Sequence, residues 1–369
     1  MNEKKQVIVA MSGGVDSSVA VALLKDQGHR VIGVTLRLLG LEAGVGCCGS
    51  TRDIEDARAV CATLDVPHYV LDFVADFKAS VRDPFVRSYV AGETPNPCID
   101  CNRFIKFDAL LKKASALGAD FVATGHYARI VRKDGIFHLE RAKDRKKDQS
   151  YVLHHLGQSE LSRLLFPLGD FDKAEAREIA RRHQLPVAEK EESMEICFVP
   201  DRDAGGYVKA AAPDAPTTVP GPLVDTSGKR LGHHKGVAFY TIGQREGLGS
   251  TFGRPVYVVD LDPAANTVMI GNNDEVYSDY FEVRDAIWTA GHPPADEFES
   301  EVQIRAHAPT VPCAVTLRPD GSVGVRANAR FRAATPGQSA VFYRGDVVVG
   351  GGTIRRSAPR NFAKTAVPA

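Results

Sequence analysis

The chain has 369 residues, long enough for two or three domains, and its hydrophobic fraction of 44% and charged fraction of 25% are those of a globular protein. This composition excludes a chain too polar to bury a core, and no apolar run approaches the roughly 18 to 20 residues of a membrane span. Basic and acidic side chains number 46 each, so the formal net charge is zero. The first apolar run enters a glycine-rich turn at once, which indicates a strand rather than a secretion signal, and we expect a cytoplasmic protein with no membrane partner.

The N-terminal half of the chain alternates strand and helix signals. Short apolar runs predict strands at 6–10, 30–36, 67–73 and 119–126. Amphipathic spacing predicts helices at 15–27, 51–64, 104–118 and 172–185. Asp172 is placed to cap the last of these helices, and Asp134-Gly135 predicts the turn of a hairpin over 130–140. This alternation predicts a parallel sheet covered by helices, with ligands at the carboxyl ends of its strands.

The pattern changes after residue 205. Proline and small residues over 210–225 predict an irregular segment, and short alternating strands follow, including one at 236–242. A further all-β stretch runs from about 280 to 355. We therefore predict an α/β domain, a small β-rich central domain and a C-terminal β-barrel-like domain, with bounds at 1–205, 206–275 and 276–369.

The segment Ser-Gly-Gly-Val-Asp-Ser-Ser, residues 12–18, lies between the first strand and the first helix. Gly13 and Gly14 allow a tight turn close to an anion, the serines add hydroxyl donors, and the helix directs its free N–H groups to the same place. Asp16 beside a phosphate would hold Mg²⁺ or shape the loop. The segment lacks the Walker pattern and resembles the PP-loop of the adenine nucleotide α-hydrolase-like ATP pyrophosphatases. The resemblance implies ATP with Mg²⁺, cleaved between the α- and β-phosphates as AMP is transferred to a substrate oxygen.

Cys98 and Cys101 stand at C-x-x-C spacing in the segment TPNPCIDCN, residues 94–102, whose two prolines predict a loop. In a cytosolic protein such thiols are reduced and are typical of metal binding or redox chemistry. Cys61 and Cys313 lie in apolar surroundings and are predicted to be inert buried thiols. Adjacent cysteines cannot easily chelate one metal, so the role of Cys47-Cys48 stays open.

Seven segments together resemble the tRNA-specific 2-thiouridylases and span about two-thirds of the chain in order. They are SGGVDSS, CCGSTRDIEDAR, TPNPCIDCNRFIKF, ATGHYAR, KDQSYVL, ESMEICFVP and YTIGQREGLG. The resemblance implies an enzyme that replaces O2 of the wobble uridine of tRNA, position 34, with sulfur. It would consume ATP, adenylate O2, and release AMP and pyrophosphate.

The same resemblance implies roles for individual residues. Cys197 would accept sulfur as a persulfide from a cysteine desulfurase or a sulfur-relay protein, and Cys101 would attack that persulfide or form a disulfide with Cys197 as sulfur departs. The residues implied around ATP are Ala10, Met11, Ser12, Gly13, Gly14, Val15, Asp16, Ser17, Leu36 and Gly125. The residues implied to contact tRNA are Asn96, Pro97 and Cys98 at the target base, with Lys147, Asp148, Gln149, Arg305 and Ala306 elsewhere.

One departure from the family pattern opens other interpretations, because many members carry Asp where this chain has Cys98. Cys98, Cys101 and Cys197 are three thiolates, the number that leaves one iron of a [4Fe–4S] cluster open to carry hydrosulfide. The same thiolates, with a fourth ligand, would suit Zn²⁺. A PP-loop ligase that uses ammonia and a non-enzymatic RNA-binding protein are the rival functions. The ligase leaves these cysteines unexplained.

Charge and flanking residues add two expectations. Residues 129–147 hold eight basic side chains against three acidic ones, and residues 301–369 hold ten against three, balances of +5 and +7 that favour a polyanion such as tRNA. Arg103, Lys106 and a helix opening near Asn102 would lower the pKa of the Cys101 thiol. His126 suits either a structural or a catalytic role, and Trp288 is predicted to be a core residue.

Overall fold

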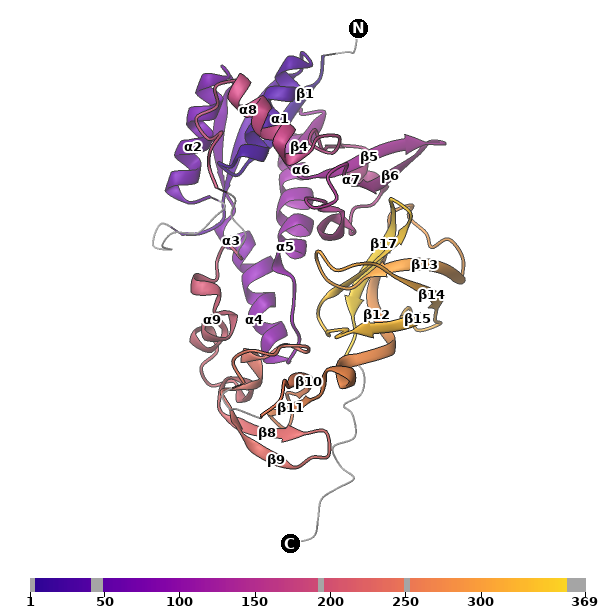
Figure 1. Cartoon of the computed structure of the whole chain (residues 1–369). Helices are drawn as coiled ribbons and strands as arrows, with labels where there is room; N and C mark the ends of the chain where they lie inside the picture. The colour runs from indigo at the N-terminus through magenta and orange to yellow at the C-terminus, as the bar shows by residue number, and fades with distance from the viewer. Residues whose placement is uncertain (1–3, 41–48, 192–195, 249–252, 357–369) are drawn as a thin grey trace.

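The computed structural model describes residues 4–40, 49–191, 196–248 and 253–356. Within them the chain forms an α/β domain, a small sheet at the opposite end of the molecule and a barrel beside the two (Figure 1). This arrangement confirms the predicted fold class. No helix in the described part of the chain is both long and apolar enough to cross a membrane.

The α/β domain is built on a parallel sheet with strand order β3-β2-β1-β4-β7. Its strands are β1 (Gln6–Met11), β2 (Arg30–Arg37), β3 (His68–Asp72), β4 (Phe121–Thr124) and β7 (Leu164–Leu165). Side chains of β1 alternate between two cores: Val7 and Val9 pack with α1 (Val15–Asp26), α2 (Thr51–Thr63) and α8 (Lys173–Arg182), whereas Ile8 packs in the core on the other face. Asp172 caps α8 as predicted, because its side chain accepts from the Glu175 N–H.

A long helical run crosses the second face of the sheet. It consists of α5 (Pro97–Asp100), a π-helical segment η2 (Cys101–Ala109) and α6 (Leu110–Ala116). The predicted start at residue 104 was wrong, because Asn96 accepts a hydrogen bond from the Cys98 N–H at 3.2 Å and Pro97 occupies the first helical position. The prolines that suggested a loop are the signal for the start of the helix.

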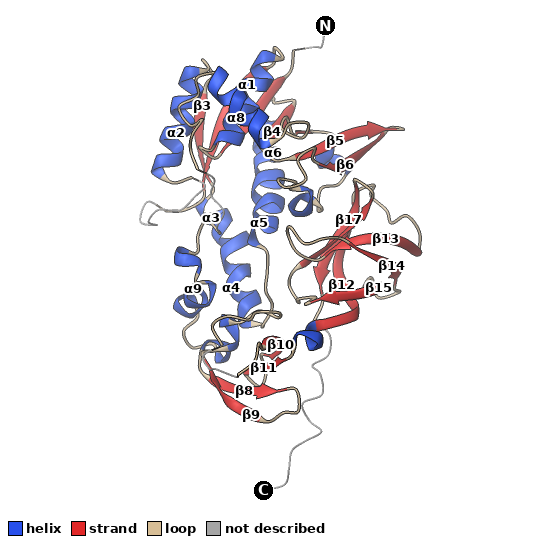
Figure 2. Ribbon diagram, in the orientation of Figure 1, coloured by secondary structure: helices blue, strands red, loops and turns tan. Residues whose placement is uncertain are grey.

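Two helical segments that sequence patterns did not indicate connect the α/β domain to the small sheet (Figure 2). The first comprises α3 (Val74–Phe77), η1 (Lys78–Arg82) and α4 (Asp83–Val90), and the second is α9 (Ala204–Ala211). Aromatic contacts join them, since Phe85 packs against Phe198 at 5.2 Å and Tyr207 at 6.1 Å between ring centroids.

The small sheet has strand order β10-β11-β8-β9. Its strands are β8 (Gly221–Asp225), β9 (Arg230–His234), β10 (Tyr257–Asp262) and β11 (Thr267–Gly271), with a 3₁₀ turn η5 (Pro216–Thr218) before them. The strand predicted at 236–242 was wrong. Val237 and Ala238 are buried as in a strand, but they lie in a 3₁₀ turn, η6 (Val237–Phe239), where the Phe239 N–H donates to the Gly236 carbonyl.

The barrel closes through the antiparallel pairing of its first and last strands, β12 and β17. Its strands are β12 (Tyr277–Trp288), β13 (Glu297–Gln303), β14 (Val311–Leu317), β15 (Val323–Arg332), β16 (Ser339–Arg344) and β17 (Val347–Ile354). The predicted hairpin is β5 (Ala128–Lys133) and β6 (Ile136–Arg141), and both turn residues, Asp134 and Gly135, have positive φ. It reaches out of the α/β domain and pairs with the barrel, with Val347 opposite Glu140 (Figure 1).

Short helical segments complete the described chain. They are η3 (Ser150–Leu153), α7 (Gln158–Leu161), η4 (Pro200–Arg202) and η7 (Asn273–Val276).

Candidate active site

The segment 12–18 forms a tight loop at the carboxyl end of β1. Gly13 has φ of +71°, and a Cβ there would lie 2.7 Å from the Asp53 Cα, so only glycine fits. The Ser17 and Ser18 hydroxyls donate to the Gly14 carbonyl at 3.1 and 2.8 Å. Gly14 is the N-cap of α1 and supplies no side-chain cap, so the first N–H groups of α1 are open to an anion.

The other residues expected around ATP lie at the same edge of the sheet. Leu36 stands near the carboxyl end of β2, and Gly125 follows β4 directly. A Cβ at Gly125 would lie 2.5 Å from the Ser17 nitrogen, so the end of β4 is packed on the start of α1. The structure therefore brings Leu36, Gly125 and residues 10–17 together where a doubly wound sheet binds ligands.

The carboxylate of Asp16 is held by two neighbours. It accepts hydrogen bonds from the Tyr127 hydroxyl at 2.8 Å and from Lys173 Nζ of α8 at 2.7 Å. The side chain of Lys173 is 15% exposed, so this is a largely buried ion pair. Asp16 thus shapes the loop, one of the two roles considered for it.

A second lysine, which sequence analysis missed, joins the loop to α2. Lys190 Nζ donates to the Gly13 carbonyl at 3.1 Å, to Asp53 at 2.9 Å and to Asp56 at 2.5 Å. Burial disfavours the charged form of Lys190, but the hydrogen bonds to Asp56 and Asp53 outweigh it and raise the pKa of Lys190. Lys173 and Lys190 therefore tie the loop to its surroundings through ion pairs with Asp16, Asp53 and Asp56.

The thiols expected to act in catalysis pack on the face of the sheet opposite to α1, α2 and α8. Cys98 is exposed in the first turn of α5, and Cys101 is half-buried where the π-helical segment begins, a helix type found mostly at functional sites. Cys197 is half-buried and packs against the same apolar core as Cys101. The next residue, Phe198, is anchored in that core by an edge contact with Phe77 at 5.6 Å between ring centroids.

The same three thiols are not arranged as a set of metal ligands. Across residues 4–40, 49–191, 196–248 and 253–356, no group of three or more His, Cys, Asp and Glu side chains is placed to hold a metal ion. Cys98, Cys101 and Cys197 therefore do not form a site for a single ion such as Zn²⁺ in this conformation, and their binding of an iron–sulfur cluster stays a prediction. Cys47 and Cys48 lie outside the described residues.

The two cysteines predicted to be inert are buried. Burial raises the pKa of Cys61 to about 11. Burial, followed by the charges of Glu299 and Glu301, raises the pKa of Cys313 to about 12. The predicted burial is confirmed, and the raised pKa values disfavour a thiolate near neutral pH, so inertness stays the expectation for both.

A cavity of about 170 Å³ separates the thiol-bearing helix from the barrel. It is lined by Ser88, Glu93, Pro95, Asn96, Ile99, Asp100, Arg284, Gly337, Ser339 and Thr353. Asp100 lies between the two thiols in sequence; burial raises its pKa to about 6, against the opposing charge of Arg103. The expected lowering of the pKa of the Cys101 thiol by Arg103 and Lys106 stays a prediction.

Several residues expected to contact tRNA use their side chains internally. The carboxylate of Asp148 accepts from Arg141 at 3.1 Å and from the Ser150 hydroxyl at 2.8 Å, and it is only 6% exposed. Gln149 Oε1 accepts from the Tyr127 N–H at 2.9 Å. The side chains of Asp148 and Gln149 therefore anchor segment 147–149, and contact of this segment with tRNA stays a prediction.

Arg305, which is also expected to contact tRNA, likewise uses its side chain for contacts within the protein. Arg305 Nη2 donates to the carbonyls of Ile242 and Ala333 at 2.9 and 3.1 Å and to the Thr335 hydroxyl at 3.0 Å, so it joins the barrel to the central domain. Ala306 is exposed. Of the residues expected at the base, Asn96 caps the helix, Pro97 is buried and Cys98 is exposed.

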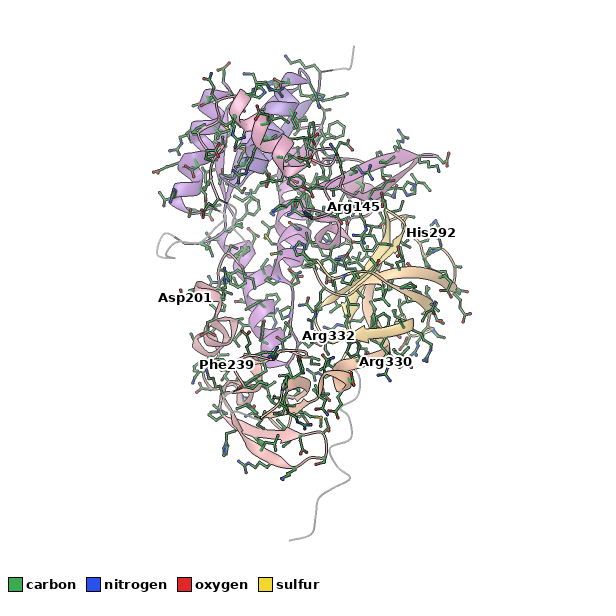
Figure 3. The ribbon with its side chains drawn as sticks, in the orientation of Figure 1. Arg145, Asp201, Phe239, His292, Arg330 and Arg332 are labelled. Atoms are coloured by element: carbon green, nitrogen blue, oxygen red, sulfur yellow. The ribbon has the colours of Figure 1, made fainter. Side chains whose placement is uncertain are left out.

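The basic segments are partly neutralised. In the first, Arg145 pairs with Asp346 of the barrel at 2.6 Å, at the junction visible in Figure 3, and Lys143 pairs with Glu175 at 2.8 Å. In the second, Figure 3 places Arg330 and Arg332 where the barrel approaches the small sheet.

The side chains of His126 and Trp288 are held by contacts within the protein. His126 is buried and hydrogen-bonds the Thr124 hydroxyl through Nδ1 at 2.7 Å, and burial holds its pKa well below its usual value. Trp288 stacks on Phe342 at 5.9 Å between ring centroids and meets the edge of Phe298, as expected for a core residue.

Comparisons with known proteins cover all three parts of the chain. Residues 5–201 match the model described as tRNA methyl transferase HUP domain, 213–272 the tRNA methyl transferase PRC-barrel domain, and 278–354 the Aminomethyltransferase beta-barrel domain. A 4-thiouridine synthetase–RNA complex with bound ATP covers 57% of this chain and 51% of its own at 16% identity, but its TM-score of 0.34 is too low to carry an argument.

Curated relatives are more specific than the domain models. Two proteins named tRNA-specific 2-thiouridylase MnmA, from Chloroflexus aggregans and Carboxydothermus hydrogenoformans, are each 49% identical to this chain. They cover 95% and 96% of it, and the chain covers 98% of each. A protein of the same name from Clostridium perfringens is 47% identical over 95% of the chain and 98% of that relative.

Proposed function

Because this chain belongs to the tRNA-specific 2-thiouridylase family, we propose that it catalyses ATP-dependent 2-thiolation of the wobble uridine, position 34, of tRNA. The observation that carries the proposal is the pairing of two sites on one sheet. A tight glycine loop lies at its carboxyl edge, with the start of α1 beside it, and two half-buried thiols, Cys101 and Cys197, share the core beneath one of its faces. We expect this activity in the cytoplasm.

The nucleotide loop supplies the activation step. The uridine O2 attacks the α-phosphorus of ATP and the α–β phosphoanhydride bond breaks, releasing pyrophosphate and leaving O2 bound to AMP. The N–H groups at the start of α1 stabilise the phosphates through this step, and Lys173 and Lys190 hold the loop in place through Asp16 and the Gly13 carbonyl. Mg²⁺ would arrive bound to the phosphates. Tyr127 and Lys173 both donate to Oδ1 of Asp16, so these contacts leave Oδ2 as the atom through which Asp16 would hold the ion.

The thiols supply the sulfur. A cysteine desulfurase or a sulfur-relay protein would load Cys197 with a persulfide, whose terminal sulfur attacks C2 as the C2–O2 bond breaks and AMP leaves. The Cys101 thiolate then attacks the Cys197 Sγ, breaking the S–S bond and leaving sulfur on C2. The product pair is 2-thiouridine and a Cys101–Cys197 disulfide, which a dithiol reductant reopens.

The matching experiment incubates the purified chain with tRNA, ATP, cysteine and a cysteine desulfurase. We expect 2-thiouridine by nucleoside mass spectrometry and one AMP per modified base. Cys197→Ser and Cys101→Ser should each abolish 2-thiouridine while leaving ATP affinity unchanged. Normal thiolation by Cys197→Ser would contradict the proposal.

Cys98→Asp separates persulfide delivery from delivery by a cluster, because it introduces the residue that many family members carry. A persulfide route requires only Cys101 and Cys197, so Cys98→Asp should keep at least a substantial part of the activity. Delivery from a [4Fe–4S] cluster needs all three thiolates, so it predicts complete loss together with the loss of bound iron.

A further inference from the structure

The barrel contacts residues 93 and 94, in the segment that leads into the thiol-bearing helix. Arg284 of β12 makes a two-pronged ion pair with Glu93, with Nη1–Oε1 and Nη2–Oε2 distances of 3.0 and 2.8 Å. The Glu93 side chain is 12% exposed, so the carboxylate is mostly shielded from water. Such a paired, planar contact fixes orientation as well as distance. Glu93 also raises the pKa of Arg284, so the guanidinium stays charged.

Hydrogen bonds from the barrel to the backbone of the next residue, Thr94, add to this ion pair. The Thr94 N–H donates to the Pro336 carbonyl at 2.8 Å, and Gln338 Nε2 donates to the Thr94 carbonyl at 2.8 Å. Gly337, with φ of +89°, makes this approach possible, because a Cβ there would lie 2.9 Å from the Thr94 nitrogen. The barrel therefore holds residues 93 and 94 through both side chain and backbone.

Residues 93 and 94 lie just before the helix that carries the thiols. Asn96 caps that helix, Pro97 opens it, and Cys98 and Cys101 follow within its first turns. A shift of Glu93 relative to the barrel therefore moves the start of the helix. A displacement on the order of 1 Å at a reacting group can reduce a rate by about a hundredfold.

We propose that the Glu93–Arg284 ion pair is a positioning device for the thiolation reaction, through which the barrel sets the place of the Cys98–Cys101 helix. The proposal rests on the proposed function, since the helix carries the thiol assigned to that reaction. Glu93 and Arg284 touch neither substrate nor reacting atoms in this role. Their effect passes through Thr94 and the helix cap.

Arg284→Ala tests the device, and Arg318→Ala is its matched control. Arg318 is also on the barrel and is as exposed as Arg284, 41% against 42%, but it pairs with Glu282 within the barrel. We expect Arg284→Ala to lower the single-turnover rate of 2-thiouridine formation by about tenfold or more while tRNA and ATP dissociation constants change less than about threefold. Arg318→Ala should leave the single-turnover rate at saturating tRNA and the ATP dissociation constant unchanged. Because Arg318 belongs to the basic segment 301–369, any change in its tRNA dissociation constant is assigned to that segment and not to the helix.

A second readout reports the helix without requiring catalysis. The rate of alkylation of Cys98 and Cys101 by iodoacetamide, followed by peptide mass spectrometry, should change in Arg284→Ala and not in Arg318→Ala. Glu93→Gln, which keeps the shape of the side chain, should change it in the same direction. The double variant Glu93→Gln/Arg284→Ala should be no slower in turnover than the slower single variant, because both changes break one interaction.

Several results would overturn the positioning role. They are equal turnover in Arg284→Ala and Arg318→Ala, a loss explained entirely by weaker tRNA binding, or additive losses in the double variant. If the wild-type chain forms no 2-thiouridine, the proposed function fails, and the alkylation rates alone decide the positioning role. Unchanged alkylation in both Arg284→Ala and Glu93→Gln would then reject it.

Discussion

Asp148 is expected from family resemblance to contact tRNA, but its surroundings predict that its substitution destabilises the fold instead. Its two oxygens accept four hydrogen bonds, from the N–H groups of Ala142 and Ser150, the Ser150 hydroxyl and the Arg141 guanidinium. Arg141 is 18% exposed and lies over the Tyr343 ring of the barrel at 3.7 Å. Asp148→Ala leaves this guanidinium largely buried without its carboxylate partner.

Breaking a buried ion pair on one side costs about 3 to 5 kcal/mol of unfolding free energy. Trp288, the only tryptophan of the chain, packs inside the barrel and reports its unfolding by fluorescence in urea. With a urea dependence of about 3 kcal/mol per M, the midpoint should fall by about 1 to 1.7 M. Asp148→Asn, which keeps an acceptor for the backbone N–H groups, should lower the midpoint by less.

Lys147→Ala is the matched control, because it changes the neighbouring residue of the same segment and removes a positive charge. If this segment lies on tRNA, Lys147→Ala should weaken binding and lower the salt dependence by about one phosphate contact, with the urea midpoint unchanged. The reasoning is refuted if Asp148→Ala keeps the wild-type midpoint and instead weakens tRNA binding as Lys147→Ala does.

Three further outcomes are expected. Gly13→Ala should abolish ATP binding measured by calorimetry, because the added Cβ would collide with α2. Gly28→Ala is the control: Gly28 has φ of +84° and nothing within 4 Å of an added Cβ, so the change should cost about 1 kcal/mol of stability and leave ATP affinity unchanged. Burial lowers the pKa of His154 to about 4, so between about pH 6.5 and 4 the unfolded chain takes up a proton that the folded chain excludes. The urea midpoint should therefore fall as the pH drops through this range, and it should fall less steeply in His154→Gln. Cys61 and Cys313 should resist iodoacetamide until urea unfolds the chain; rapid labelling in the folded protein would contradict their raised pKa values.

Local patterns predicted the parts of the fold that local physics determines. The β1 strand, the glycine loop and α1 follow from an apolar run, two glycines and helical spacing, and the hairpin turn follows from Asp134-Gly135. The helix start at Pro97 was missed because Asn-Pro was interpreted only as a loop signal, although Asn at an N-cap and Pro at the first helical position are start signals.

Other features depend on contacts between distant residues, and no local pattern reveals these. Lys190 stands in a charged run that resembles a solvated surface, yet it contacts a loop near the N-terminus. The position of Lys190 just before the segment of Cys197 is the one signal that could have indicated it. Glu93 and Arg284 illustrate the same limit. Glu93 directly precedes the segment TPNPCIDCN, but nothing in the sequence around Arg284 points to it, and their pairing appears only when barrel and helix meet.

The hairpin formed by β5 and β6 has a consequence for synthesis on the ribosome. Its strand β6, which pairs with the barrel, is complete once residue 141 is made, but its partner β17 begins only at Val347. At about 5 to 20 residues per second, the nascent hairpin waits on the order of 10 to 40 seconds with an unpaired edge. Arg132 and Lys133 at its tip would repel edge-to-edge association between nascent chains during that interval.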